Sequence, residues 1–325
     1  MPNKLFKIIA PSSAFYYNEQ QFALAVQRLA DLGIDISYGK NIGRGGFMGS
    51  ASIIERVDEI VDAFTNPKID GIMAIIGGIN SEELLDYIPW DIIAKNPKFF
   101  CGFSDITVLQ NALLAKCDMV TFSGPHFSSF YMKHGFDYTL ENFKKALAGG
   151  EYAVQPSTQW ANDKWWIEQE NRTFYKNNGW KVINPGTANG RIIGGNLSSF
   201  AILQGTEYMP DFKNSVLFLE ESTMQEEGTE ATFQFFLRQL GGLIKQPGFD
   251  GVRGIAIGRF HTDAGVTDKH LEYIVESHPK LKNIPIIANL DFGHTVPIFT
   301  FPIGGQCEFN ADANGKIDLK LKTDK

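Results

Sequence analysis

The segment FFCGFSDITVLQ, residues 99–110, places a serine at the junction of a strand pattern and a helix pattern. Gly102 permits a sharp turn there, because glycine adopts backbone conformations that other residues avoid. A strand, a tight turn and a helix form the nucleophile elbow of many hydrolases, which raises a serine hydroxyl above the sheet. Ile106 replaces the second glycine of the G-x-S-x-G motif, and this segment alone favours the alternative that Ser104 caps the helix.

Strand and helix patterns alternate on both sides of this corner. Apolar strand patterns cover residues 4–10, 34–39, 69–76, 98–103 and 119–125, and helix patterns cover residues 18–33, 51–66, 81–88 and 105–116. The run IDGIMAII at 69–76 is almost entirely apolar, as in parallel strands that are buried on both faces. The first half is therefore predicted to be an α/β unit with an open parallel sheet and right-handed crossovers.

A polar, turn-rich stretch from residue 151 to 187 interrupts the alternation and contains four of the five tryptophans. Long segments without periodicity in compact proteins are usually functional or flexible, so we predict a link between two domains and a lid. Strand and helix patterns resume at 190–205, 215–221, 228–244, 251–260, 268–278 and 284–294, and Asn314-Gly315 indicates a hairpin within 307–321. The predicted parts of the chain are 1–150, 151–187 and 188–325.

The composition is that of an ordinary globular protein, and it argues against several classes. The 325 residues are 43% hydrophobic and 21% charged, with a net charge of −7 and no cluster of Lys and Arg for a nucleic acid. No apolar run approaches the ~20 residues of a membrane span. Three scattered cysteines suit a reducing compartment, so we expect a cytoplasmic protein. Metal-ligand spacings and a clean phosphate-binding loop are both missing, and we expect no metal and no cofactor.

A nucleophilic serine needs a base, and histidine is the usual one because its pKa lies near neutrality. His294 follows an apolar strand pattern and would emerge at a strand end, where open α/β sheets bind their ligands. His261 also ends a strand and competes for the role, and His126 in SGPHFSS could line a cleft. For each histidine the alternative is a loop residue with local hydrogen bonds.

The acidic partner of such a base would come from Glu220 and Glu221, which close the strand SVLFLEE. Adjacent side chains on a strand point to opposite faces, so at most one faces a given cleft, and the spacing does not say which. The alternative is an ordinary exposed strand end. The Gly77-Gly78 turn precedes a helix pattern, and backbone N–H groups at such a turn can bind developing negative charge. Its alternative is a tight turn without a chemical role.

In combination, these motifs resemble the LD-carboxypeptidase family of serine peptidases. Similarity to its N-terminal half lies in DGIMAIIGGINSEELL (70–85), FFCGFSDITVLQNALLAK (99–116) and VTFSGPHFSSF (120–130). Similarity to its C-terminal half lies in GRIIGGNLSSF (190–200), SVLFLEES (215–222) and DFGHTVPIFTFPIG (291–304). The resemblance covers nearly the whole chain in the right order. Within the family, GGINSEELL, SGPHFSSF and the Trp-rich middle resemble the microcin C self-immunity branch more than the murein-recycling branch.

The resemblance implies a Rossmann-like N-terminal domain with a parallel sheet, a smaller β-rich C-terminal domain, an active site in the cleft between them, and a homodimer. It implies a catalytic triad of Ser104, His294 and Glu220, and an oxyanion hole from the backbone N–H groups of Gly78 and Asp105. The implied partner is a small peptide or a peptidyl-nucleotide substrate, and neither a nucleic acid nor a membrane.

We therefore expect a metal-independent serine peptidase that cleaves an amide near the C-terminus of a small peptide or an aminoacyl-nucleotide. The alternatives are a murein tetrapeptide L,D-carboxypeptidase, a non-catalytic binding protein on the same fold, and an esterase of the α/β-hydrolase type. An intact serine, histidine and glutamate set argues against the binding protein. The missing elbow glycine and the two-domain pattern argue against the esterase.

The microcin C branch implies an aromatic clamp on the adenine ring from the middle segment. Trp165, Trp166 and Trp180 supply aromatic rings there, and stacking on a base contributes about 1–3 kcal/mol. The alternative, which we favour for two of the three, is that these rings pack the segment onto the domain. Asn80 and His126 are further candidates for substrate binding.

A cation is missing at the position where this branch implies a lysine near the phosphate. Four residues after Glu220 stands Met224, followed by Gln225, Glu226 and Glu227. Because phosphates need N–H donors or cations, the chain should prefer a sulfamoyl-linked or purely peptidic leaving group over a phosphoramidate. The measurement is kcat/KM for matched aspartyl substrates that differ only in the linker. A clear preference for the phosphate-bearing substrate would contradict this prediction.

Overall fold

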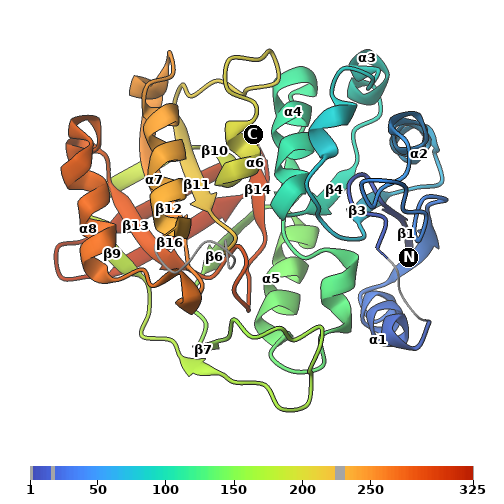
Figure 1. The fold of residues 1–325 in the computed structure, drawn as a ribbon, viewed down its shortest axis with the longest axis horizontal. Coiled ribbons are helices and arrows are strands. Elements are labelled where there is room, and N and C mark those ends of the chain that lie inside the picture. The colour runs from blue at the N-terminus through green and yellow to red at the C-terminus, as the bar shows by residue number, and fades with distance from the viewer. Residues whose placement is uncertain (1–2, 16–18, 224–230, 325) are drawn as a thin grey trace.

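Two large sheets, each with helices packed against it, organise the chain (Figure 1). The computed structural model describes residues 3–15, 19–223 and 231–324. The prediction about Met224 and the three residues after it concerns positions outside these ranges. The α/β class with a parallel N-terminal sheet and a separate β-rich sheet is confirmed.

The first sheet has six strands in the order β14-β5-β4-β3-β1-β2, and the five from the N-terminal half are parallel. These strands are β1 (Lys4–Ile9), β2 (Ile34–Tyr38), β3 (Gly71–Ala74), β4 (Phe99–Gly102) and β5 (Thr121–Ser123). The helices of this half are α1 (Glu19–Ala30), α2 (Ile53–Thr65), α3 (Trp90–Ala94), α4 (Thr107–Cys117) and α5 (Asp137–Ala148). Every residue of β3 is buried, as its apolar pattern predicts.

Three features of this half differ from the sequence prediction. The helix expected at 81–88 is a short 3-10 helix, Ser81–Leu84, and the patterns missed α3 and α5. The sixth strand, β14 (Phe301–Ile303), comes from the far end of the chain and pairs antiparallel with β5. A three-residue strand is too short for a periodic pattern, and its Pro302 is tolerated because β14 lies at the sheet edge.

The second sheet has eight strands in the order β6-β16-β15-β10-β11-β12-β13-β9. They are β6 (Glu151–Val154), β9 (Lys181–Asn184), β10 (Gly186–Asn196), β11 (Ser215–Glu220), β12 (Val252–Gly258), β13 (Ile286–Leu290), β15 (Gln306–Ala311) and β16 (Ile317–Lys322). The helices are α6 (Leu197–Ala201), α7 (Ala231–Ile244) and α8 (Asp268–Ser277). Strands β10 to β13 are parallel, so their carboxyl ends share one edge, and β15 and β16 confirm the predicted hairpin.

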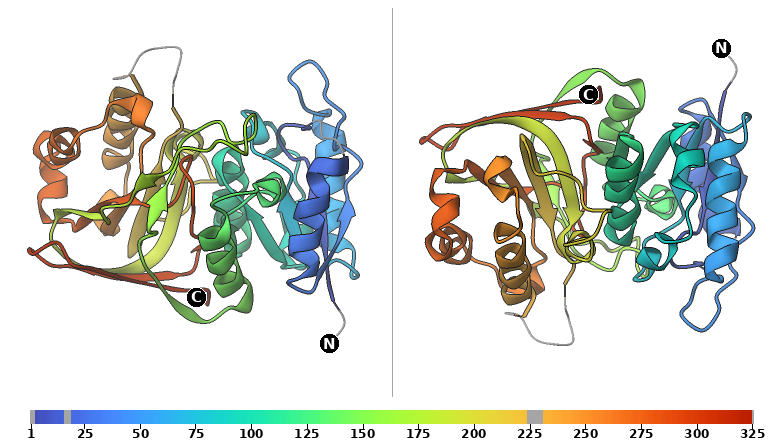
Figure 2. Two further views of the ribbon diagram at one scale, coloured as in Figure 1. Left: turned by 90° about the horizontal axis from the view of Figure 1, so that it is seen from below. Right: turned by 90° about the horizontal axis from the view of Figure 1, so that it is seen from above.

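Helix α4 lies between the two sheets (Figures 1 and 2). Its first eight residues, Thr107 to Leu114, are all buried, as expected of a helix with protein on every side. The Asn111 side chain donates to the Gly194 carbonyl at 2.8 Å and accepts from the Gly194 N–H at 3.1 Å. The Thr107 hydroxyl accepts from the Asn196 N–H at 3.0 Å. These bonds fix the start of α4 at the carboxyl end of β10.

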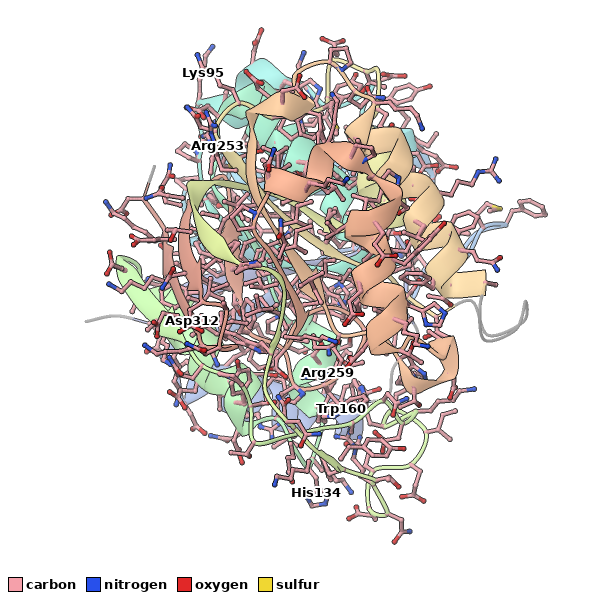
Figure 3. The ribbon with its side chains drawn as sticks, turned by 90° about the vertical axis from the view of Figure 1, so that its left-hand side faces the viewer. Lys95, His134, Trp160, Arg253, Arg259 and Asp312 are labelled. Atoms are coloured by element: carbon pink, nitrogen blue, oxygen red, sulfur yellow. The ribbon has the colours of Figure 1, made fainter. Side chains whose placement is uncertain are left out.

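The middle segment, residues 151–187, pairs with the second sheet at both of its ends. Its ends supply β6 and β9, and a small antiparallel pair joins β7 (Gln159–Trp160) to β8 (Tyr175–Lys176). Ala161 exchanges two backbone hydrogen bonds with Val296, in the loop that follows β13. The guanidinium of Arg259 lies 4.9 Å from the centre of the Trp160 ring (Figure 3).

A buried carboxylate makes a further connection between the middle segment and the second sheet. Asp291, just after β13, is 1% exposed. It accepts hydrogen bonds from Ser157 N and Oγ, Asn177 Nδ2, Trp180 Nε1 and Arg259 Nη2. A buried charge is tolerated when it is paired and fully hydrogen-bonded, and here four of the five donor groups belong to the middle segment. The segment therefore braces the loop between β13 and β14. The part boundaries drawn from the sequence remain a prediction.

Candidate active site

Ser104 occupies a strained corner directly after β4. Its φ is +61°, a region that non-glycine residues enter rarely and mainly at functional sites. The strained residue is thus Ser104 itself and not Gly102. Gly102 instead accommodates a close approach, because a Cβ there would lie 3.0 Å from Ile106 Cγ2 and 3.2 Å from Ala74 Cβ, tighter than ordinary van der Waals contact.

The Ser104 hydroxyl points to a histidine and does not cap a helix. The 3-10 turn Ser104–Ile106 has Phe103 as its cap, α4 has Ile106, and neither has a side-chain capping bond. Ser104 Oγ lies 3.1 Å from His294 Nε2, although 190 positions separate them. The capping alternative is therefore wrong for Ser104.

His294 connects this hydroxyl to a buried carboxylate. His294 Nδ1 lies 2.8 Å from Glu220 Oε2, and Glu220 is the last residue of β11. Glu220 is 3% exposed, and its second oxygen, Oε1, is buried without a hydrogen-bond partner among the described residues. With Nδ1–H donated to the carboxylate, Nε2 is the nitrogen that accepts the Ser104 hydroxyl hydrogen.

The electrostatics around His294 favour its protonated form. Burial by itself lowers the pKa of His294, but the charge of Glu220, its hydrogen bond and the charge of Glu221 together raise the pKa above its ordinary value. The side chain keeps 27% of its surface exposed, so a molecule from solution can reach it. The ring is placed to take up a proton and hold it.

Glu221, the residue after Glu220, has a different set of hydrogen-bond partners. It accepts hydrogen bonds from Ser198 Oγ at 2.6 Å and from Asn196 Nδ2 at 3.3 Å. Burial raises the pKa of Glu221, and the Ser198 bond offsets part of that rise. Strand alternation sends the two carboxylates to different partners, as predicted. Both are buried, so the alternative of an exposed strand end is wrong.

The Gly77-Gly78 turn lies against the Ser104 corner. A Cβ on Gly77 would lie 2.9 Å from Ser104 Cβ, 3.1 Å from Ser104 Oγ and 3.4 Å from Asp105 N. Only glycine permits this approach. The turn is therefore beside the hydroxyl, where backbone donors for a developing oxyanion are needed.

The two other candidate histidines, His126 and His261, form no hydrogen bond with the Ser104 hydroxyl among the described residues. His126 is 3% exposed and stacks on the Phe103 ring with centroids 4.2 Å apart. Burial lowers its pKa to about 3, so the ring is neutral and braces the residue before Ser104. His261 is bonded to Asn162, and no hydrogen bond joins it to Ser104 within the described residues.

The remaining substrate-binding candidates differ in how far their side chains are exposed. Asn80 is 4% exposed, and its amide is engaged with Ser50. Trp180 is buried with its indole N–H on Asp291, and Trp165 packs against Tyr131 and Trp166, while Trp166 is 53% exposed. Of the three tryptophans, Trp166 thus has the most accessible ring.

The described residues contain neither a cluster suited to a metal ion nor a helix suited to a membrane. Among residues 3–15, 19–223 and 231–324, no group of three His, Cys, Asp or Glu side chains could hold a metal ion. In the same part of the chain, no helix has both the length and the apolar character to cross a bilayer.

Comparison with known proteins gives strong similarity over nearly the whole chain. The family model of the LD-carboxypeptidase N-terminal domain matches residues 6–124, and that of its C-terminal domain matches residues 189–309. The putative carboxypeptidase YocD of Bacillus subtilis is 41% identical over 308 residues, which cover 94% of this chain and 93% of that protein. The microcin C7 self-immunity protein MccF of Escherichia coli is 32% identical over 319 residues, which cover 94% and 90%.

Solved structures agree with these relatives. The crystal structure of an MccF-like protein from Bacillus anthracis has a TM-score of 0.95 and 42% identity, covering 99% of this chain and 98% of that one. A structure of MccF in complex with aspartyl sulfamoyl adenosine has a TM-score of 0.83 and 28% identity, covering 100% and 98%.

The glycine before His294 offers a direct test of this geometry. A Cβ at Gly293 would lie 2.5 Å from Glu220 Oε2, and the residue has φ +101°. Gly293→Ala should push the carboxylate away and lower the pKa of His294, because Glu220 raises it. An NMR titration of the His294 ring measures this. Gly315→Ala is the matched control, since φ is +89° and nothing lies within 4 Å. An unchanged His294 pKa in Gly293→Ala would count against the contact.

Proposed function

The chain belongs to the LD-carboxypeptidase family of serine peptidases, and we propose that it hydrolyses an amide with a triad of Ser104, His294 and Glu220. The observation that carries the proposal is the unbroken series of hydrogen bonds from Ser104 Oγ through the His294 ring to Glu220 Oε2. Family membership favours an enzyme over a non-catalytic binding protein or an α/β-hydrolase esterase.

In the first half of the reaction, Ser104 Oγ attacks the amide carbon while His294 Nε2 takes its proton. Glu220 holds the imidazole in orientation and stabilises its charged form, in keeping with the raised pKa of His294. The backbone N–H groups of Gly78 and Asp105 stabilise the tetrahedral oxyanion. Removing one such donor typically costs about 10²–10³ in kcat.

The second half returns the enzyme to its starting state. His294 gives its proton to the leaving nitrogen as the C–N bond breaks, and an acyl ester remains on Ser104. Water then attacks the ester carbon while His294 Nε2 takes its proton. The bond from that carbon to Ser104 Oγ breaks, His294 returns the proton to Oγ, and the acid leaves. The exposed quarter of the His294 side chain faces the solvent from which that water comes.

We propose as substrate a small peptide or a peptidyl- or aminoacyl-nucleotide cleaved near its C-terminus. Support comes from the relative MccF, solved with aspartyl sulfamoyl adenosine and with glutamyl sulfamoyl guanosine. A murein tetrapeptide is the second candidate, because the family models describe LD-carboxypeptidases. The exposed Trp166 is the candidate ring for a nucleobase. A cytoplasmic homodimer remains part of the proposal.

A mass-spectrometric screen of the purified protein tests the activity and separates these substrates. The panel contains murein tetrapeptide, aminoacyl sulfamoyl adenosines and processed microcin C. Hydrolysis of at least one of them supports the proposal, and the preferred one identifies the substrate class. A protein that cleaves none of them would refute it.

Ser104→Ala should abolish turnover and leave the fold almost intact. Loss of a triad nucleophile costs about 10⁶ in kcat, whereas loss of one hydrogen bond costs about 0.5–1.5 kcal/mol of folding free energy. Turnover of the best substrate and urea unfolding measure the two effects. Near-normal turnover in this variant would end the serine-peptidase proposal.

Glu220→Gln should harm catalysis far more than Glu221→Gln. Only Glu220 bonds the His294 ring, and replacing an orienting carboxylate by an amide in a serine protease lowers kcat about 10⁴-fold. Glu221 bonds Ser198 instead and serves as the matched control, since it is the adjacent carboxylate and also buried. Equal losses of kcat in the two variants would mean that the assignment of the acid is wrong.

A further inference from the structure

The two proposed oxyanion donors belong to different loops. Gly78 lies in the turn after β3, and Asp105 lies in the corner after β4. Two donors stabilise one oxyanion only if their spacing is held to a fraction of an ångström. In the proposed mechanism the backbone N–H of Asp105 is an oxyanion donor, and the Asp105 side chain has no role.

That side chain lies between the two loops and is 3% exposed. Asp105 Oδ2 accepts a hydrogen bond from the Ser81 backbone N–H at 2.9 Å, three residues after Gly78. The Ser81 hydroxyl donates to the Asp105 carbonyl at 2.8 Å. Two hydrogen bonds thus connect Asp105 to the start of the 3-10 helix that follows the glycine turn.

A third loop meets the same carboxylate oxygen. The hydroxyl of Ser12, in the loop after β1, donates to Asp105 Oδ2 at 2.6 Å. A Cβ on Gly78 would lie only 2.2 Å from this hydroxyl, and the Ser13 N–H donates to the Gly77 carbonyl at 3.1 Å. The loop after β1 therefore packs directly on the glycine turn while its serine bonds Asp105.

A second set of hydrogen bonds, from Arg56, connects the same loops. Arg56 is 1% exposed, and its Nη1 donates to the Pro11 carbonyl at 3.2 Å and to the Asn80 carbonyl at 3.0 Å. The guanidinium thus joins the loop after β1 to the segment that follows the glycine turn. Asp105 is the member of this network that also carries a proposed oxyanion donor.

We propose that the Asp105 carboxylate is a positioning residue that holds the Gly77-Gly78 turn against the Ser104 corner and so sets the spacing of the two oxyanion donors. The inference rests on the proposed function. The carboxylate acts through Ser81 and Ser12 and does not touch the substrate. Its contribution belongs to the transition state, because the oxyanion forms only there.

The test compares Asp105→Ala with Asp105→Asn in the full-length protein. Both bonds use one oxygen, Oδ2, so the amide oxygen of asparagine can replace it, while alanine removes it. Asp105→Ala should lower kcat about 10²-fold or more, with KM within a few-fold of wild type. Asp105→Asn should recover most of that loss.

Binding of a peptide aldehyde gives a second readout. The aldehyde forms a tetrahedral adduct with Ser104 whose oxygen occupies the oxyanion site, whereas the uncleaved substrate does not. Asp105→Ala should weaken aldehyde inhibition by a factor close to its loss of kcat. A role confined to folding would lower the melting temperature and leave kcat and aldehyde affinity of the folded protein unchanged.

If Asp105→Ala does not fold, Ser12→Ala decides. It removes the hydroxyl that lies 2.6 Å from Asp105 Oδ2 and 3.3 Å from Asn80 Oδ1, and it leaves the Ser81 bond to Asp105 in place. It should lower kcat and aldehyde affinity together, while Ser277→Ala, on α8, should leave both unchanged. Unchanged kcat in whichever of Asp105→Ala and Ser12→Ala folds would overturn the inference but not the proposed function. An Asp105→Asn variant as poor as Asp105→Ala would do the same. Wild-type protein that neither cleaves a substrate nor binds the aldehyde overturns the proposed function as well.

Discussion

The docking of α4 on β10 is the contact on which the site depends. Two bonds between the Asn111 amide and the Gly194 backbone, with a third from Asn196 N–H to Thr107, join the two sheets. Gly194 and Gly195 have φ of +110° and +127°, and a Cβ on Gly195 would lie 2.6 Å from the Thr107 hydroxyl. The helix approaches the strand this closely because Gly195 has no side chain, whereas a Cβ on Gly194 would instead lie 2.4 Å from the Phe218 carbonyl oxygen of β11.

This contact determines where the chemistry can occur. Ser104 begins the 3-10 turn Ser104–Ile106 that leads directly into α4, so fixing the helix at the end of β10 also fixes the hydroxyl there. Asn196 is in register with Glu220 on the neighbouring strand β11, which places the carboxylate at the same edge. Gly258 and Gly293 leave room for the Glu220 side chain, since a Cβ on either would lie 2.8 Å from Glu220 Cβ. His294 then lies between hydroxyl and carboxylate.

Buried carboxylates organise the surroundings of the site, and each has one set of partners. Glu220 bonds the His294 ring, Glu221 bonds Ser198 and Asn196, and Asp291 ties the middle segment to the loop before His294. Asp105 joins the loops on the Ser104 side. Because an unpaired buried charge is costly, each of these groups fixes its donors in place. Hydrogen-bonded carboxylates therefore lie on both the Ser104 side and the Asp291 side of His294.

The sequence by itself determined the alternating strands and helices, the serine corner and the histidine at a strand end, because these are local patterns of a few residues. Adjacent Glu220 and Glu221 were equivalent by spacing, as were His261 and His294, and resemblance to a family was needed to choose between them. Only the tertiary structure decided that Ser104 bonds a ring 190 positions away, that Trp180 is buried on Asp291, and that β14 crosses to the first sheet. Such contacts depend on which strand ends become neighbours, which local periodicity does not encode.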